Sequence, residues 1–336
     1  MSLKNKTQIY IIVSFFLLII LFLTAVMIGR YNVTVSTFIK IVSGNDNVPI
    51  IDKNIVLNLR IPRTIVALLT GVALSISGLV YQEIFNNKLV SPDLLGVSSG
   101  ASVGAAFSIV LGYTGLVISL FSFTLGLITM FLTLIISRIF KSSSSVFLLL
   151  AGVIVGGFMS SATGLFKYLA SSDRQLSEIT FWLLGSFSSV TYNSVIILLP
   201  IVLFGVMTLF LLRWKINILA LGPEEATSVG INYKTLRMVV IICATLLTAG
   251  TVAIAGVIGW IGLVIPHISR ILVGRNTKRT IPLTMMIGAC FMIIVDVISR
   301  SFTSTEIPLS VVTGFLGTPL FLIILYTKRG IVNERD

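Results

Sequence analysis

Runs of about 20 apolar residues recur along the whole chain and constrain its fold more than any other feature. A helix of that length can cross the roughly 30 Å hydrocarbon core of a bilayer. The chain is 56% hydrophobic and only 11% charged, which is far more apolar than ordinary soluble proteins. We therefore expect an all-α polytopic membrane protein in which residues 1–336 form a single transmembrane domain.

Eight membrane spans can be placed directly, and one long apolar stretch requires a choice. The eight lie near residues 9–28, 64–82, 94–112, 116–136, 146–166, 193–212, 281–298 and 309–326. The stretch 236–269 is too long for one ordinary span, contains several glycines and ends close to Pro266. Basic clusters flank it on both sides, and both should be cytoplasmic, so it must cross an even number of times. One full span and one short, glycine-broken span give about ten transmembrane helices.

The connecting segments indicate the orientation. More Lys and Arg residues fall in the segments that this count places inside, which favours two cytoplasmic termini. The first span is too long for a signal peptide. Residues 31–62 form the longest polar external loop, and residues 176–187 are apolar but too short to span. For this last segment we expect a half-helix that lies at, or re-enters from, the outer surface.

The letters GVSSG at residues 96–100 match the G-x-S-x-G pattern of a serine hydrolase. Such a nucleophile requires a preceding strand and a nearby histidine, and the chain has one histidine, His267. Ser91 followed by proline predicts a helix N-terminus, so Ser98 should lie in a helix and bond to its backbone. A close-packing helix face is then the better interpretation; it consists of Gly96, Gly100 and Gly104.

Several chemistries are excluded or disfavoured by missing motifs. The sequence has no G-x-x-x-x-G-K-[ST] motif, so we expect no ATP hydrolysis by this chain, no enzymatic activity and no cofactor. A single histidine cannot form a metal site, and Cys243 and Cys290 are expected to be buried thiols. The scattered basic residues do not indicate nucleic-acid binding. Asp296 has Arg300 four residues later, which favours a plain ion pair over a proton site.

Long segments of the chain resemble the FecCD family of permease subunits in ATP-binding-cassette (ABC) importers for iron-siderophores, haem and cobalamin. The segments include GVALSISGLVYQEIFNNKLVSPDLLGVSSGASVG from Gly71, LLLAG at 148–152, GVIGWIGLVIPHISR from Gly256 and EIPLSVVTGFLGTP from Glu306. The resemblance implies a ten-helix subunit of the bacterial cytoplasmic membrane. It also implies four kinds of neighbour, namely a second permease subunit that is the same or homologous, two ABC ATPase subunits, an extracytoplasmic substrate-binding protein and membrane lipid.

The resemblance also implies roles for particular residues. Arg60, Arg63 and Arg300 would dock the binding protein, because guanidinium groups facing carboxylates guide docking. The segment LALGPEEATSVG would couple to the ATPase, with Leu221, Gly222, Glu224, Ala226 and Gly230 as candidates. Ser144 and Ser145 would form the cytoplasmic gate, although a serine run is also an ordinary turn.

The sequence departs from the family pattern at two places, and it leaves alternative functions open. The chain has NKLV at 87–90 where the family usually has N-P-L-A, and Ser310 replaces a usual glycine. We expect the import of an iron chelate, specifically a ferric siderophore, with haem, cobalamin or another chelate as alternatives. Two other classes stay open as weaker hypotheses: an ATPase-independent secondary transporter or channel, and an intramembrane serine hydrolase built around Ser98.

Overall fold

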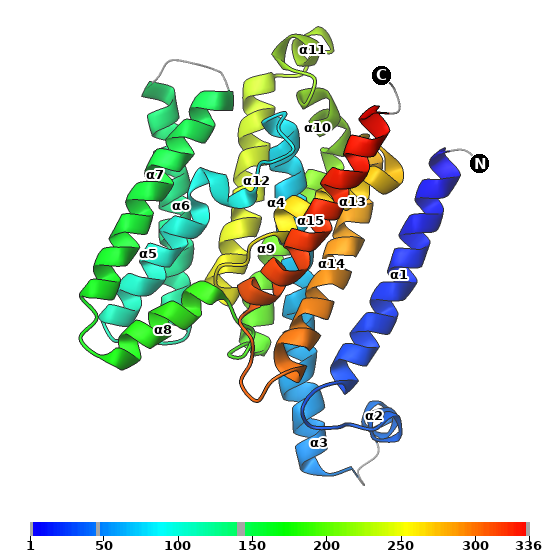
Figure 1. The fold of residues 1–336 in the computed structure, drawn as a ribbon, viewed down its shortest axis with the longest axis vertical. Coiled ribbons are helices and arrows are strands. Elements are labelled where there is room, and N and C mark those ends of the chain that lie inside the picture. Colours follow the sequence, from blue (N-terminus) through cyan, green and yellow to red (C-terminus); the bar gives the residue numbers. More distant parts are fainter. Residues whose placement is uncertain (1–2, 45–47, 140–144, 334–336) are drawn as a thin grey trace.

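The computed structural model describes residues 3–44, 48–139 and 145–333, which form a bundle of helices (Figure 1). The described residues contain no β-strand. The helices are α1 (Leu3–Met27), α2 (Val35–Val42), α3 (Ile50–Asn54), the π-helix η1 (Ile55–Arg60), α4 (Ile61–Ile84), the 3-10 turn η2 (Pro92–Leu95), α5 (Val97–Val110), α6 (Leu116–Ile139), α7 (Ser145–Tyr168), α8 (Asp173–Leu184), α9 (Tyr192–Leu211), α10 (Arg213–Leu219), α11 (Pro223–Ser228), α12 (Tyr233–Ala255), α13 (Ile261–Val273), α14 (Thr277–Ser301) and α15 (Leu309–Asn333).

Ten of the described helices are apolar membrane helices, eight of them long and two short. The eight are long and apolar enough to cross a membrane, whereas α5 has 14 residues and α13 has 13. At 1.5 Å per residue these two reach about 20 Å, less than the hydrocarbon thickness. The predicted polytopic all-α fold is confirmed. The prediction of a full span at 94–112 is wrong, because the chain turns at Gly96 and α5 begins only at Val97.

The polar segment 31–62, expected as a loop, is largely helical. It contains α2 and α3, and α3 runs through η1 into α4 as one helix from Ile50 to Ile84. The second membrane helix therefore begins well before the predicted residue 64. The π-helical turn η1 ends at Arg60, two residues before Pro62. Because proline has no N–H, the regular helical hydrogen-bond pattern is interrupted here, and the π-helical turn coincides with this interruption.

The long apolar stretch divides as predicted into one full and one short helix, α12 and α13. The break runs from Gly256 to Trp260, and both residues have positive φ, of 71° and 70°. Pro266 does not end the stretch as expected but lies inside α13. Proline donates no backbone hydrogen bond to the carbonyl four residues earlier, which is that of Gly262. Gln82 Nε2 donates to this carbonyl instead, over 3.3 Å.

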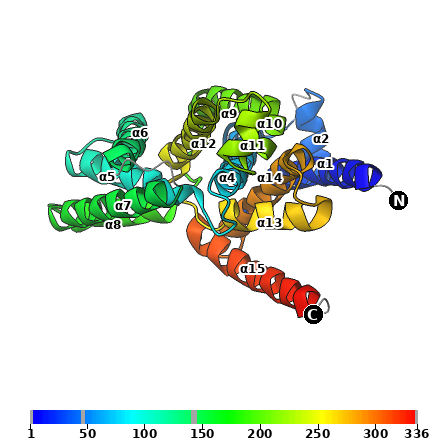
Figure 2. The ribbon, with the colours of Figure 1, turned by 90° about the horizontal axis from the view of Figure 1, so that it is seen from above.

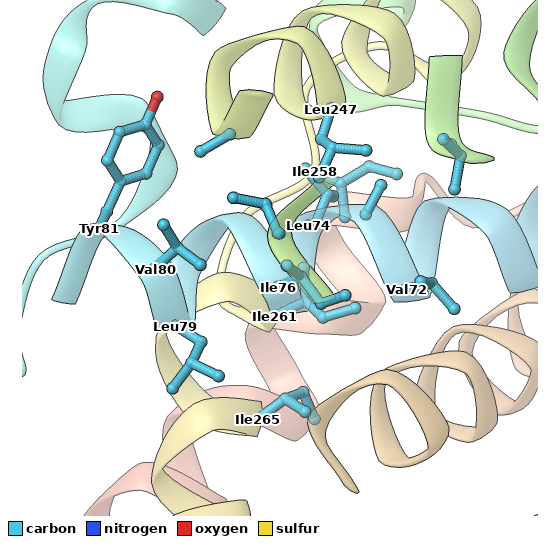
Figure 3. Close-up of a cluster of buried hydrophobic side chains, with 14 of the residues drawn as sticks. Val72, Leu74, Ile76, Leu79, Val80, Tyr81, Leu247, Ile258, Ile261 and Ile265 are labelled. Carbon is cyan, nitrogen blue, oxygen red and sulfur yellow. The ribbon is translucent and has the colours of Figure 1, made fainter. Parts of the chain in front are cut away.

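Helix α4 lies at the centre of the bundle and packs against α9, α12, α13 and α14. Its apolar side chains form the core with residues of α12 and α13, including Leu247 and Ile265 (Figure 3). Small residues let the backbones approach closely: a Cβ on Gly78 would lie 1.9 Å from Gly262 O, and one on Gly71 would lie 2.2 Å from Gly288 O.

The remaining helices surround this centre (Figure 2). Helices α5 to α8 form a group on one side, while α1 and α15 lie on the other. The start of α1, the end of α15 and helices α10 and α11 lie at one end of the molecule, and α2 and α3 lie at the opposite end (Figure 1). The segment 176–187, expected to form a half-helix, contains most of the 12-residue helix α8, which is too short to span.

Candidate functional site

A buried cluster of charged residues joins three segments at the α3 end of the molecule. Arg63, in the first turn of α4, donates from Nε to Asp296 Oδ1 over 2.6 Å. Its two terminal nitrogens bind Glu306 Oε1 and Oε2 over 2.6 and 3.0 Å. Arg300 Nε lies 3.3 Å from Asp296 Oδ2, so Asp296 is shared by two arginines. The cluster therefore ties α4 to α14 and to the segment before α15.

The third arginine of this region, Arg60, binds backbone oxygens. Its guanidinium donates to Val26 O, Met27 O and Tyr31 O over 3.2, 2.6 and 2.5 Å. Val26 and Met27 end α1, where the carbonyls lack helical partners and the helix dipole is negative. Helix α1 thereby receives a cationic C-terminal cap from another segment of the chain.

The structure does not present Arg60, Arg63 and Arg300 as the docking surface expected from the sequence. Their exposed fractions are 5%, 8% and 6%. Burying a guanidinium is costly unless its charge and its N–H groups find partners. Arg63 and Arg300 are paired with Asp296, and Arg60 donates to three backbone oxygens. The part of the cluster that reaches solvent is Glu306, whose side chain is 32% exposed. The arginines thus link segments of this chain to one another.

At the opposite end, the segment expected to couple to an ATPase is a short and well-defined helix. Pro223 begins α11 and Glu224 and Glu225 occupy its first turn, where negative charge is favourable. Gly222 and Gly230 flank it with φ values of 126° and 75°, which favour glycine.

The two faces of α11 differ in exposure. Ala226 is fully buried and anchors the helix. Leu221 and Val229 are 64% and 53% exposed, beside the exposed Glu224 and Glu225. Of the three apolar side chains in this segment, only Ala226 faces inward. The result is an apolar and acidic outer surface on a short helix flanked by two glycines.

A second buried ion network, which the sequence did not reveal, lies between α4 and α13. Glu83 Oε1 is 3.1 Å from Lys88 Nζ and 3.0 Å from Arg270 Nη2. Arg270 Nη1 also donates to Gln82 Oε1 over 2.6 Å. Burial lowers the pKa of Lys88, and the charge of Glu83 opposes that shift. Lys88 belongs to the NKLV segment that departs from the family pattern, so this departure provides one partner of the network.

The GVSSG segment is not a hydrolase elbow. Ser98 lies in the first turn of α5, follows a 3-10 turn and not a strand, and donates to the Asp93 carboxylate, not to its own helix backbone as expected. His267 Nδ1 bonds to Leu263 O over 2.8 Å, and its ring meets Phe321 edge-on. These partners indicate a structural role for His267. Ser91 is the N-cap residue of η2 and Pro92 its first residue, as predicted, although the Ser91 side chain makes no capping hydrogen bond.

Two of the three predicted packing glycines face α6. A Cβ on Gly100 would lie 2.0 Å from Thr129 Oγ1, and one on Gly104 would lie 2.3 Å from Phe121 O. Gly96 is outside the helix, with a left-handed φ of 77°, so it does not share their helix face as expected. A Cβ there would lie 3.3 Å from Gly156 N, in α7.

The predicted gate falls at the edge of the described structure. Ser144 lies outside the described residues, and so does the side chain of Ser145, the first residue of α7.

Comparisons with known proteins match most or nearly all of the chain to permease proteins and transporters. Residues 17–327 match the model of the FecCD transport family. The chain is 37% identical over 329 residues to the molybdate import system permease protein MolB of Haemophilus influenzae, covering 95% of this chain and 97% of the relative. It is 38% identical over 277 residues to an iron chelatin transport system permease protein of Helicobacter pylori, covering 82% and 84%. A solved metal-chelate type ABC transporter in an inward-facing conformation superposes with a TM-score of 0.86 at 34% identity, covering 94% and 98%.

Proposed function

Because the chain belongs to the FecCD transport family, we propose that it is the permease subunit through which an ABC importer carries a ferric siderophore into the cytoplasm. The observation that carries this proposal is the combination of 38% identity to an iron chelatin permease and the close superposition on a metal-chelate type transporter. In this proposal a separate ATPase subunit supplies the energy, and the chain itself provides the membrane passage.

The outer surface of α11 supports the position proposed for the ATPase. An exposed pair of apolar side chains, Leu221 and Val229, flanks two exposed carboxylates on a helix held by Ala226. Apolar anchors with a charged rim are typical of protein interfaces. We assign this end to the cytoplasm, since α10 and the start of α14 also carry the basic residues expected there. Both termini are then cytoplasmic.

The opposite end is the proposed docking face for the substrate-binding protein. Docking there by Arg63 would require its guanidinium to leave Glu306, which already occupies both terminal nitrogens. A carboxylate from the binding protein could take the place of Glu306, because this is the exposed side of the cluster. The second permease subunit, identical or homologous, completes the proposed assembly.

The test is reconstitution of the chain with its ATPase and binding protein in proteoliposomes. A ferric siderophore should stimulate ATP hydrolysis and accumulate inside, whereas haemin and cobalamin should do neither. If haemin or cobalamin alone stimulates ATP hydrolysis, that compound is the substrate in place of the siderophore, and the ABC mechanism still holds. Uptake that continues without any nucleotide would instead identify a secondary transporter or channel and reject the ABC mechanism.

Molybdate is the second candidate substrate, because the relative named for molybdate aligns over nearly the whole of both chains. The same reconstituted system distinguishes the two candidates when molybdate and a ferric siderophore are supplied separately. ATP hydrolysis stimulated by molybdate, with no response to the iron chelate, would overturn the siderophore proposal.

A further inference from the structure

Two cations and one tryptophan form a patch at the junction of α10 and α14. The patch consists of Arg213, Trp214 and Lys278, and it lies at the α11 end of the molecule (Figures 1 and 2). Lys278 Nζ is 5.9 Å from the centroid of the Trp214 ring, and Arg213 Cζ is 3.9 Å from that of Phe210. Both cations thus lie over aromatic rings, a favourable arrangement for a positive charge near a membrane.

Hydrogen bonds hold the two sides of the patch together. Asn217 Oδ1 accepts from Thr277 N and Thr277 Oγ1 over 3.1 and 3.2 Å, which fixes the N-terminus of α14 against α10. On a helix, residues three and four apart share a face, so Trp214 and Arg213 lie on the side of α10 that carries Asn217. Lys278 directly follows Thr277. The patch is therefore built by two fixed helix ends.

The patch continues a membrane-facing stripe of α9. Four of the exposed apolar side chains of α9 recur at helical spacing and end one turn before Trp214; they are Ile196, Leu203, Met207 and Leu211. Trp214 is itself 46% exposed. Tryptophan is enriched at the boundary between hydrocarbon and headgroups, where its ring meets apolar chains and its N–H meets water. Trp214 is therefore expected at the level of the lipid headgroups.

The positive charges of the patch have no carboxylate partner among the described residues. Neither Arg213 nor Lys278 forms an ion pair with a carboxylate in the parts of the chain that the structure describes. Lys215 and Arg279, the next residues along, add further positive charge. Basic groups at the membrane surface attract anionic lipids, and basic sites between membrane helices bind their headgroups.

We propose that Arg213, Trp214 and Lys278 bind the phosphate headgroup of an anionic phospholipid, with phosphatidylglycerol as the chemical type. Lys278 and Arg213 donate to the phosphate oxygens, and the Trp214 ring packs on the glycerol and the first methylenes of the acyl chains. The continuity with the apolar stripe of α9 selects a lipid over a soluble anion, which would not need that stripe. The site is independent of the transported substrate.

Native mass spectrometry of the full-length protein tests this assignment. The protein is released from mixed micelles that contain equal amounts of phosphatidylglycerol and phosphatidylcholine. We expect preferential retention of phosphatidylglycerol, and a roughly fivefold loss of its association for each positive charge removed by Arg213→Gln and Lys278→Gln. Lys40→Gln is the matched control, since it removes an exposed lysine at the opposite end of the molecule and should leave the preference intact.

Fluorescence quenching provides a second measurement that identifies the site. In a Trp182→Phe, Trp260→Phe background, Trp214 is the remaining tryptophan, and brominated phosphatidylglycerol should quench it more than brominated phosphatidylcholine does. Equal quenching by both lipids, or an unchanged lipid preference in the double variant lacking Arg213 and Lys278, would overturn the proposal. Loss of lipid quenching on addition of the ATPase subunit would assign the patch to a protein interface instead, and relief of quenching by inorganic phosphate would identify a soluble-anion site.

Discussion

Arg63 and Asp296 are joined by a 2.6 Å hydrogen bond between α4 and α14, although 233 positions separate them in the sequence. Asp296 also faces Arg300, and Arg63 also holds Glu306, so one buried carboxylate organises the α3 end of the molecule. Such a cluster is stable as a set because each charge has a partner. Its removal one member at a time should be costly, since the remaining charges stay buried.

Asp296→Asn should strongly destabilise the protein. The substitution leaves two buried guanidinium groups, of Arg63 and Arg300, with Glu306 as their only remaining acid in the cluster, at an expected cost of about 3–5 kcal/mol. Glu306→Gln is the matched comparison, and its partly exposed side chain should contribute about 1 kcal/mol or less. Thermal unfolding of the detergent-solubilised protein measures both. Equal melting temperatures for the two variants would contradict the central role of Asp296.

Glu83→Gln should destabilise the contact between α4 and α13 more than Lys88→Gln does. Loss of the Glu83 charge leaves Arg270 and Lys88 facing each other without an anion, whereas loss of Lys88 preserves the Glu83–Arg270 pair. We expect Glu83→Gln to lower the free energy of unfolding by about 3 kcal/mol. Lys88→Gln should lower it by less than about 1 kcal/mol, because Lys88 is partly exposed. Urea unfolding in mild detergent measures the free energy of unfolding of both variants. A larger loss for Lys88→Gln than for Glu83→Gln would reject the assignment of Arg270 as the main partner of Glu83.

Gly104→Ala should disrupt the packing of α5 on α6. The added methyl group would lie 2.3 Å from a backbone oxygen, Phe121 O, which cannot move away without shifting α6. Overpacking of this kind costs about 1–3 kcal/mol. The control is Gly157→Ala in α7, where a Cβ has no neighbour within 4 Å. If both variants keep the melting temperature of the parent protein, the close approach of α5 and α6 is not a stability determinant.

Glu224→Arg should uncouple ATP hydrolysis from transport while the permease itself stays assembled. Glu224 is exposed on α11 and makes no ion pair within the described residues, so the substitution reverses a surface charge without breaking an internal contact. Substrate-stimulated ATPase activity should fall at least tenfold. The control Asp173→Arg makes the same charge change on α8, away from α11, and should retain the ATPase subunit on co-purification. Full coupling in Glu224→Arg would remove α11 from the proposed interface.

The sequence by itself determined the membrane architecture. Inside hydrocarbon every backbone N–H and C=O must be satisfied within the chain, so an apolar run of sufficient length has to be a helix. The division of residues 236–269 into α12 and α13 followed from glycines and charge parity, which are local or countable features. The resemblance to the FecCD family likewise rested on contiguous segments.

Only the tertiary structure decided which side chains meet. The sequence paired Asp296 with Arg300 along one helix. It did not reveal that Arg63 of α4 binds Asp296, or that Glu306 in turn binds Arg63. It did not reveal that Arg60, Arg63 and Arg300 are buried, because an arginine near a span end has the same local pattern whether it faces solvent or a neighbouring helix. Gly96 was assigned to a helix for the same reason, since its left-handed φ depends on how η2 packs against α6 and α7. Helix formation is set by local composition and solvent, whereas partner choice depends on the relative rotation and position of helix faces, which distant residues determine.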